Sequence, residues 1–296
     1  MKNIAIIGSG VVGCATGKGL MSKGHDITFY DIKKGIINSL RNQGYKAKHA
    51  DSLDANAHDA FFLLVPTPTE NGKINLGYLK RAVKNLAKKL KKRKNYFLVV
   101  IRSTVLPGTT EDVVIPILER GSGKKAGSDF GVVMNPEYLR EKKAEDDFKN
   151  PWIITVGALD RKSMRFMAKL YQDFNCPIHN LSLREAEMQK YVHNLFNAVK
   201  IAFFNEMRIA CNLIKISPEK IFEITADSAE ASWNKKYGLR NYGPFDGMCL
   251  PKDTKAFSSW SKKLNIHPDV LDGAINANKK YQIFWKKMKK KKVKSE

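Results

Sequence analysis

The feature that constrains this chain most lies near its beginning, where a short apolar run leads into Gly-Ser-Gly-Val-Val-Gly at residues 8–13. The pattern predicts a strand over Asn3–Ile7, a tight turn and the start of a helix. Gly8 permits the turn, Gly10 lets the backbone approach a pyrophosphate, and Gly13 lets the helix pack closely on the strand. Because a helix N-terminus attracts phosphate, this segment predicts a dinucleotide-binding unit.

An acidic residue closes the next apolar run: Asp31 lies 18 residues past Gly13. A carboxylate at this place accepts hydrogen bonds from both hydroxyls of a ribose and repels a 2′-phosphate. The sequence therefore favours NAD over NADP, a preference that Lys33 and Lys34 weaken slightly. The cofactor residues predicted from this motif are Gly8, Gly10, Val11, Val12, Gly13 and Asp31.

Apolar runs alternate with amphipathic helical patterns through the first half of the chain. Runs of this kind, apolar on both faces and separated by helices, predict an α/β fold with a Rossmann-like, doubly wound parallel sheet. The strands are predicted at Asn3–Ile7, Asp26–Tyr30, Ala60–Val65, Tyr96–Ile101 and Phe130–Met134, with Trp152–Val156 as a late addition.

The second half predicts an all-helical domain. A stretch from Arg184 to about Leu213 holds no Pro or Gly and carries a broad apolar stripe, which indicates one long helix. Shorter helices are expected at Pro218–Ala226, Lys252–Leu264 and Pro268–Tyr281. We therefore expect an NAD-binding domain over 1–184, a helical domain over 185–281 and a solvated basic tail over 282–296.

Composition excludes several classes of protein. The 296 residues are 43 % hydrophobic, too many for a disordered or collagen-like chain, and no apolar stretch is long enough for a membrane span. Four cysteines are too few for a disulfide framework, which favours a reducing compartment, the cytoplasm. Six histidines and four cysteines show no metal-ligand spacing, so no metal is expected. The glycines that interrupt the N-terminal apolar run favour mature protein over a targeting signal.

Four further segments occur in a fixed order. They are Val-Pro-Thr-Pro at 65–68, Ser-Thr-Val-Leu-Pro-Gly-Thr at 103–109, Asn-Pro-Glu-Tyr-Leu-Arg-Glu at 135–141 and Gly-Met-Cys-Leu-Pro-Lys-Asp at 247–253. Together they resemble the nucleotide-sugar dehydrogenases that oxidise UDP-glucose or GDP-mannose at C6. Lys190 and Asn194 stand where that family carries its lysine and asparagine. The resemblance covers residues 3 to about 280.

The resemblance implies a four-electron oxidation that uses two NAD⁺ and passes through a cysteine thioester to the uronate. It makes Cys249 the nucleophile, Asp253 and Lys190 a proton relay, and Asn194 the support of the oxyanion. The family's water-positioning threonine and glutamate correspond to Thr104 and Glu137. Further cofactor contacts implied are Val65, Pro66, Thr67, Ser103, Thr104 and Glu141; substrate contacts are Tyr138, Leu139, Lys190, Asn194, Phe245, Gly247 and Lys252.

Each chemical role has a structural alternative. Cys249 could be a small buried apolar residue, as we expect of Cys14, Cys176 and Cys211. Lys190 could extend its ammonium to solvent along an apolar helix face. Glu137, which follows Asn-Pro, could be an ordinary acid at a helix start.

Three departures from the family pattern affect the expected activity. The loop before Cys249 reads Pro-Phe-Asp-Gly-Met at 244–248, where the family has Gly-Phe-Gly-Gly-x. A lysine, Lys142, follows Glu141 where the family usually has glycine. Full-length members continue past the place of Glu296 with a third, nucleotide-binding domain. An active short enzyme, an enzyme completed by a partner, and a fold that lacks the chemistry all remain open.

Two other functions compete with this one. A two-domain β-hydroxyacid dehydrogenase uses a helix lysine and asparagine to transfer a single hydride without a thiol. A non-catalytic truncated homologue would bind only NAD or polyanions, since the net charge is +23 and segments 80–94 and 279–294 each hold nine basic residues. Charge runs are usually solvated helix faces, so no specific nucleic-acid partner is expected. The long apolar helix predicts a homodimer through the helical domain.

Overall fold

The computed structural model describes residues 1–213, 215–228, 243–263 and 269–292. The chain forms two compact units. The sheet unit comprises Met1–Pro68 and Ile74–Lys190, and the helical unit comprises Thr69–Lys73 and Tyr191–Glu296. Helix α7, Leu183–Leu213, begins in the first unit and continues in the second.

The sheet unit is built on eight strands in the order β10-β9-β8-β7-β4-β1-β2-β3. Their bounds are β1 Asn3–Ile7, β2 Asp26–Asp31, β3 Ala47–His49, β4 Ala60–Leu63, β7 Phe97–Ile101, β8 Phe130–Met134, β9 Ile154–Ala158 and β10 Ile178–Leu181. This confirms the Rossmann-like α/β prediction. One edge differs, because β9 pairs antiparallel with β8 and β10 then pairs parallel with β9. The connection after β8 returns into the sheet at the same end, so β9 runs in the opposite direction. The prediction of a parallel sheet is therefore wrong at this edge.

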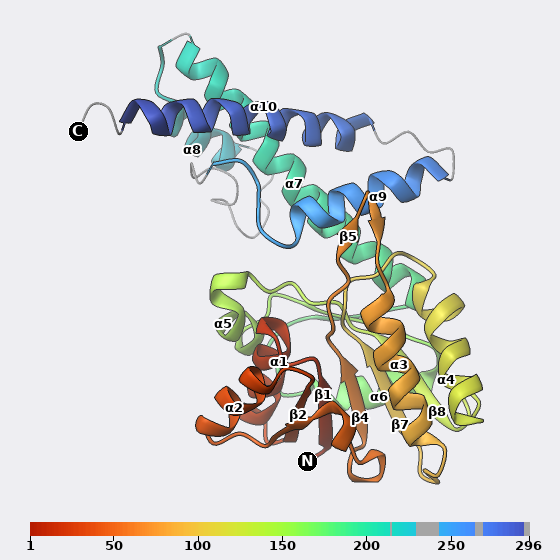
Figure 1. Ribbon diagram of the computed structural model, residues 1–296. Coiled ribbons are helices and arrows are strands. Elements are labelled where there is room, and N and C mark those ends of the chain that lie inside the picture. The colour runs from red at the N-terminus through yellow and green to blue at the C-terminus, as the bar shows by residue number, and fades with distance from the viewer. Residues whose placement is uncertain (214, 229–242, 264–268, 293–296) are drawn as a thin grey trace. The chain divides into compact units, whose positions relative to one another are not determined.

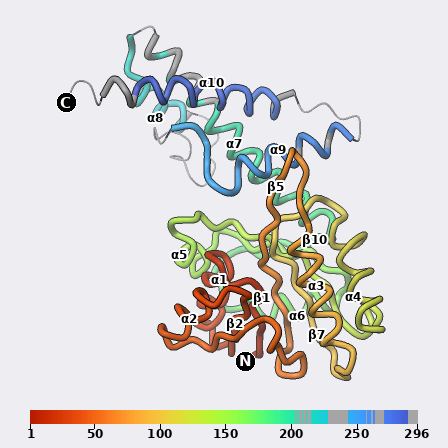
Figure 2. The backbone as a smooth tube through the Cα atoms, viewed as in Figure 1, coloured from red at the N-terminus to blue at the C-terminus, as the bar shows by residue number. Residues whose placement is uncertain are grey.

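Helices cover both faces of this sheet. Those of the sheet unit are α1 Val11–Ser22, α2 Lys34–Asn42, α3 Gly77–Leu90, α4 Ile115–Ser122, α5 Ala144–Lys149 and α6 Arg161–Leu170. Short turns of 3₁₀ helix lie at Ala50–Ser52, Ala55–Ala57 and Glu141–Lys143, and a π-helical turn lies at Thr110–Val114. In Figure 2, α3 and α4 lie together, as do α1 and α5.

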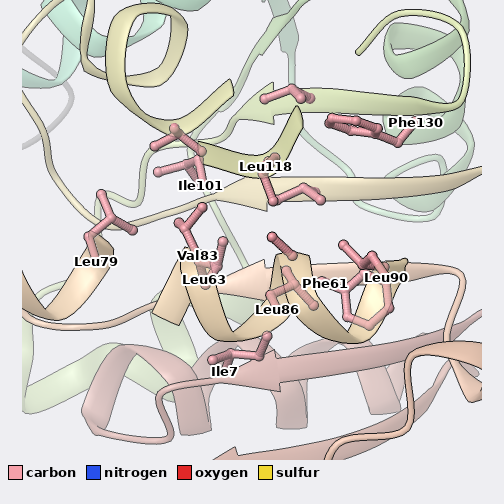
Figure 3. Packing of buried hydrophobic residues seen from close by; sticks show 14 of the residues in the cluster. Ile7, Phe61, Leu63, Leu79, Val83, Leu86, Leu90, Ile101, Leu118 and Phe130 are labelled. Atoms are coloured by element: carbon pink, nitrogen blue, oxygen red, sulfur yellow. The ribbon is translucent and has the colours of Figure 1, made fainter. Parts of the chain in front are cut away.

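Alternation along the strands divides the core into two layers, since successive strand side chains point to opposite faces. Phe61 and Leu63 pack in the layer beneath α3 and α4, whereas Phe62 packs in the layer of α1, α2, α5 and α6. Figure 3 shows the first layer, where α3 presents apolar residues at helical spacing to the strands: Leu79, Val83, Leu86 and Leu90. Burying each such side chain contributes roughly 1.5–3 kcal/mol.

The helical unit contains the rest of α7 together with α8 Pro218–Ser228, α9 Leu250–Lys263 and α10 Asp269–Lys292 (Figure 1). The long helix is confirmed; Leu264 and Pro268, predicted helix ends, lie outside the described residues. The structure differs from the prediction of a solvated basic tail over 282–296, because helix α10 continues through Lys292. Lysine is a good helix former, so its charge does not end the helix. Residues Thr69–Lys73 also belong to this unit, and they hold most of the hairpin of β5 Thr69–Glu70 and β6 Lys73–Ile74. Thr69 Oγ1 donates to the Lys252 carbonyl over 3.2 Å.

Within the part of the chain that the structure describes, no helix is long and apolar enough to cross a membrane. The same residues hold no group of three or more His, Cys, Asp and Glu side chains arranged to bind a metal ion.

Candidate active site

The glycine-rich turn between β1 and α1 has a different constraint at each glycine. Gly8 has φ +94°, and a Cβ there would lie 2.5 Å from the Leu64 carbonyl oxygen. A Cβ on Gly13 would lie 2.0 Å from the Gly8 carbonyl oxygen. A Cβ on Gly10, the N-cap of α1, would meet nothing within 4 Å. Gly8 and Gly13 are therefore needed by the fold, whereas Gly10 leaves open space at a helix N-terminus, which fits a pyrophosphate.

Asp31 is held across this turn. Its side chain is buried, with Oδ2 accepting from the Ser9 N–H over 2.8 Å and Oδ1 accepting from the Lys33 N–H over 2.9 Å. An ionised carboxylate has about four acceptor positions, so two bonds leave capacity for ribose hydroxyls. The position at the end of β2 and the spare acceptors fit the ribose of NAD.

A cavity of about 670 Å³ opens at the glycine-rich turn. Ser9, Gly10 and Val11 border it together with residues of α2 and α5, and Glu141 lies at the same cavity. Val12 is partly exposed in the first turn of α1. The volume is within the range of small-molecule sites, and the predicted cofactor residues at 10, 11 and 141 meet at this cavity.

The loops after β4 and β7 are joined by two side chains. Ser103 Oγ donates to the Val65 carbonyl over 2.7 Å, and Thr67 Oγ1 donates to the Thr104 carbonyl over 2.7 Å. Pro66, between them, is exposed. These bonds bring together predicted cofactor residues that the sequence separates by almost forty positions, at the carboxyl ends of two adjacent strands.

A buried ion pair lies beyond the end of β8. Glu137 Oε1 is 3.1 Å from Lys190 Nζ, which also donates to the Glu137 carbonyl, and Glu137 Oε2 accepts from the Leu139 N–H over 2.6 Å. Burial alone raises the pKa of the Glu137 carboxyl, but Lys190, the Leu139 N–H and Arg102 together outweigh it and lower that pKa. The carboxylate is therefore ionised, and neither the helix-start alternative for Glu137 nor the solvent-facing alternative for Lys190 holds.

The neighbouring Tyr138 supports this loop from inside. Its hydroxyl donates to Gln189 Oε1 and forms a second hydrogen bond, over 2.8 Å, with the Thr155 hydroxyl, which can donate in turn. Burial raises the pKa of Tyr138 to about 12. Leu139 packs partly buried against the core. Both predicted substrate residues thus have side chains turned toward the sheet unit.

Cys249 lies in the helical unit, directly before α9. Its side chain is exposed, and its carbonyl accepts the Asp253 N–H over 2.8 Å as the first bond of the helix. A helix N-terminus favours the thiolate form of a cysteine. The buried-apolar alternative is therefore wrong for Cys249; of the other cysteines, Cys211 is buried and Cys14 and Cys176 are partly buried.

Asp253 joins the residues around the cysteine. It is 1 % exposed, its Oδ2 accepts from Asn194 Nδ2, and its Oδ1 pairs with Lys252 Nζ over 2.6 Å. Lys190 bonds Glu137 in the sheet unit, so the relay between Lys190 and Asp253 stays a prediction. Of the other predicted substrate residues, Phe245 is buried in the core and Gly247 is exposed.

Two buried charged residues in the sheet unit were not found from the sequence. Arg102 donates from Nε to Thr16 Oγ1 over 3.1 Å and helps to keep Glu137 ionised. Glu187 accepts from the Gly108 N–H over 2.5 Å and the Thr110 N–H over 2.8 Å, and burial raises its pKa. An acid inside the inward stripe of a helix, three residues before Lys190, was the available signal for Glu187.

A cofactor cradle at the carboxyl ends of parallel strands, followed by a helical unit, defines a two-unit NAD-dependent dehydrogenase. The sequence comparisons give the family. Residues 45–175 match the NAD-binding domain of the UDP-glucose/GDP-mannose dehydrogenase family, and residues 184–280 match its central domain. The chain therefore belongs to the UDP-glucose/GDP-mannose dehydrogenase family, as the motifs predicted.

Individual relatives agree with this placement. The chain is 32 % identical to a GDP-mannose 6-dehydrogenase of Pseudomonas putida, over 93 % of this chain and 67 % of the relative. It is 34 % identical to a UDP-glucose 6-dehydrogenase of Haloferax volcanii, over 93 % and 69 %. Among solved structures, a UDP-glucose dehydrogenase of Pyrobaculum islandicum superposes with a TM-score of 0.83 at 29 % identity, over 94 % of this chain and 68 % of that one.

Proposed function

We propose that this chain oxidises a nucleotide sugar of the UDP-glucose or GDP-mannose type at C6, in two steps, to the uronate. The observation that carries the proposal is the exposed Cys249 at the N-terminus of α9, one helical turn before the buried Asp253 that Asn194 and Lys252 contact. A thiol in this position is suited to attack an aldehyde. A dehydrogenase that transfers a single hydride requires no such nucleophile.

The chemistry expected of Cys249 is covalent. Its thiolate adds to the aldehyde carbon, which forms a C–S bond, and the oxygen takes up a proton to give a thiohemiacetal. Loss of a hydride from the carbon and of a proton from the hydroxyl converts this to a thioester, and attack by water then breaks the C–S bond to release the carboxylate and the thiolate. NAD⁺, when bound, accepts the two electrons of each oxidation.

Proton transfer and charge stabilisation fall to the surrounding side chains. We assign alcohol deprotonation to Lys190 and Asp253, and support of the developing oxyanion to Asn194. Thr104 and Glu137 are assigned to the hydrolytic water; the lowered pKa of Glu137 supports this, because an ionised carboxylate accepts a hydrogen bond from water. Lys252 is assigned to orient charge near the thiolate, and Gly10 and Asp31 to hold the pyrophosphate and ribose of the cofactor.

Assembly and compartment are part of the proposal. Val192 and Phe196, one turn apart on α7, are 52 % and 56 % exposed, which favours a homodimer through the helical unit. Light scattering should give twice the chain mass, and a concentration-independent monomer would contradict it.

None of the four cysteines, all within the described residues, is in a disulfide, which supports a reducing cytoplasm.

The decisive experiment combines the purified chain with NAD⁺ and either UDP-glucose or GDP-mannose. We expect two NADH per uronate, no uronate from Cys249→Ser, and ordinary turnover from the matched control Cys176→Ser. One NADH per substrate, insensitive to Cys249→Ser, would instead support a β-hydroxyacid-type reaction. NAD⁺ binding without turnover of either sugar would contradict the enzymatic proposal and favour a binding protein.

A further inference from the structure

The loop that leads to Cys249 is buried at its two ends and exposed between them. Phe245 and Leu250 both belong to a core cluster with Ala198 and Ala202 of α7, whereas Asp246 to Cys249 are exposed. The thiol therefore lies on a four-residue exposed segment whose position depends on what holds the backbone at Phe245.

That backbone is held by one amide side chain. Asn278 Oδ1 accepts from the Phe245 N–H over 2.7 Å, and Asn278 Nδ2 donates to the Phe245 carbonyl over 2.9 Å. The carboxamide thus satisfies both polar groups of a single residue, as a neighbouring β-strand would. No strand of the described part of the helical unit performs this task, since its only hairpin is β5–β6.

The place of Asn278 in α10 indicates that the contact is specific. It lies on the inward face of the helix beside Ala274, Ala277 and Tyr281 and is itself 7 % exposed. A buried amide among apolar neighbours is costly unless its donors and acceptor are used. Two positions earlier, Asn276 is exposed on the same helix.

A second asparagine holds the start of the loop. Asn205 of α7, 1 % exposed, donates from Nδ2 to the Gly243 carbonyl over 3.2 Å. Gly243 has φ +95°, and a Cβ there would lie 2.9 Å from Trp285 Nε1, so the chain turns against α10 at this point. The loop that enters α9 in Figure 1 is thus held by Asn205 of α7 at Gly243 and by Asn278 of α10 two residues later.

We propose that Asn278 is a positioning residue that fixes the backbone at Phe245 and so holds the Cys249 thiol at the N-terminus of α9. Without it, we expect the exposed segment to shift and the thiol to move away from the N-terminus of α9, an environment that favours a thiolate. The consequence for turnover rests on the proposed function, but the consequence for thiol reactivity does not.

The test is alkylation of Cys249 by iodoacetamide across pH, followed on the Cys249 peptide by mass spectrometry. In this reaction the thiolate displaces iodide, so the rate reports the thiolate fraction and needs no substrate. For Asn278→Ala we expect a rate at pH 7 about 3–10-fold lower, with the midpoint of the pH profile raised. Asn276→Ala, the matched control, should give the wild-type profile.

Asn278→Asp separates positioning from loss of fold. It keeps an acceptor for the Phe245 N–H but loses the donor to the Phe245 carbonyl, so its profile should lie between wild type and Asn278→Ala. If Asn278→Ala does not fold, this variant carries the test alone. Wild-type alkylation profiles in the folded Asn278 variants would overturn the proposal, even if their stability is lowered.

Turnover then separates this inference from the proposed function. In an active enzyme, Asn278→Ala should lower kcat and leave the KM for NAD⁺ unchanged, because the cofactor cradle lies in the sheet unit. If the wild-type chain turns over neither sugar but alkylation depends on Asn278, the proposed function fails while the positioning role stands.

Discussion

The two sets of candidate active-site residues are held by different means. In the sheet unit, the glycine-rich turn and the loops at Val65 and Ser103 follow parallel strands, so the hydrogen-bonded ladder places them. In the helical unit, the Cys249 loop follows no strand and is placed by the side chains of Asn205 and Asn278. In a strand ladder, many backbone hydrogen bonds together fix where a loop begins. In the loop before Cys249, one or two side chains do so. Single polar substitutions should therefore change geometry more in the second region than in the first.

Side-chain contacts also hold parts of the sheet unit, and among them the buried Glu137–Lys190 pair gives the largest expected effect. Lys190→Ala leaves the buried Glu137 charge without its partner, which typically costs about 3–5 kcal/mol of stability. Urea unfolding combined with hydrogen exchange of sheet-unit peptides would measure it. Exposed Lys169→Ala on α6 is the control, with an expected change within about 0.5 kcal/mol.

A double variant tests whether charge or shape causes that loss. Glu137→Gln with Lys190→Met removes both charges and keeps side-chain volume, so most of the stability should return. If the double variant is as unstable as Lys190→Ala, the pair contributes through packing, and the region is less dependent on the ion pair than we infer.

The glycine-rich turn provides a matched pair of substitutions with a smaller effect. Gly13→Ala forces a Cβ against the Gly8 carbonyl, and we expect about 1–3 kcal/mol of destabilisation together with weaker NAD⁺ binding. Gly10→Ala meets no protein atom within 4 Å, so it should weaken NAD⁺ binding while stability changes by no more than about 0.5 kcal/mol. Calorimetric titration with NAD⁺ and thermal unfolding separate the two effects. Equal destabilisation by both would contradict this division.

The contrast between the regions also explains what the sequence could predict. Strand runs, the long helix and the glycine-rich turn follow from local periodicity, which a strand or helix imposes directly. The ion pair joins Glu137 to Lys190 across 53 positions, and Asn278 reaches Phe245 across 33. Such pairings depend on tertiary packing and leave no local pattern. The buried amide of Asn278 was detectable only as a polar residue on an apolar helix face. The antiparallel β9 was missed because an apolar run carries no direction.

Acid should loosen the sheet unit through a buried histidine. Burial lowers the pKa of His58 below its ordinary 6.5, and Nε2 is 3.0 Å from the Tyr30 hydroxyl. Above pH 6.5 both the folded and the unfolded chain hold it neutral, so it has no pH effect. Below 6.5 the unfolded chain takes up a proton that the folded chain resists. The free energy of unfolding therefore decreases as the pH is lowered below 6.5, by up to about 1.4 kcal/mol per pH unit from this residue. Between pH 7.5 and 5.5, the unfolding midpoint should depend less on pH in His58→Gln than in the wild type. A variant of the exposed His179 should keep the wild-type dependence.

The last comparison concerns the loop before Cys249 and asks how much each of its two anchors, Asn205 and Asn278, contributes to holding it. Asn205→Ala removes one hydrogen bond and should cost about 0.5–1.5 kcal/mol, whereas Asn278→Ala removes two bonds to a single residue and should cost about twice that. Asn197→Ala is the control on α7, because that amide bonds His193 on the same helix. Urea unfolding compares the three variants.

Because Gly243 is six residues from Cys249 and Phe245 is four, Asn205→Ala should also change the alkylation profile of the thiol less than Asn278→Ala does. An equal or larger change from Asn205→Ala would show that the loop is fixed at its start, and that α7 rather than α10 determines where the thiol lies.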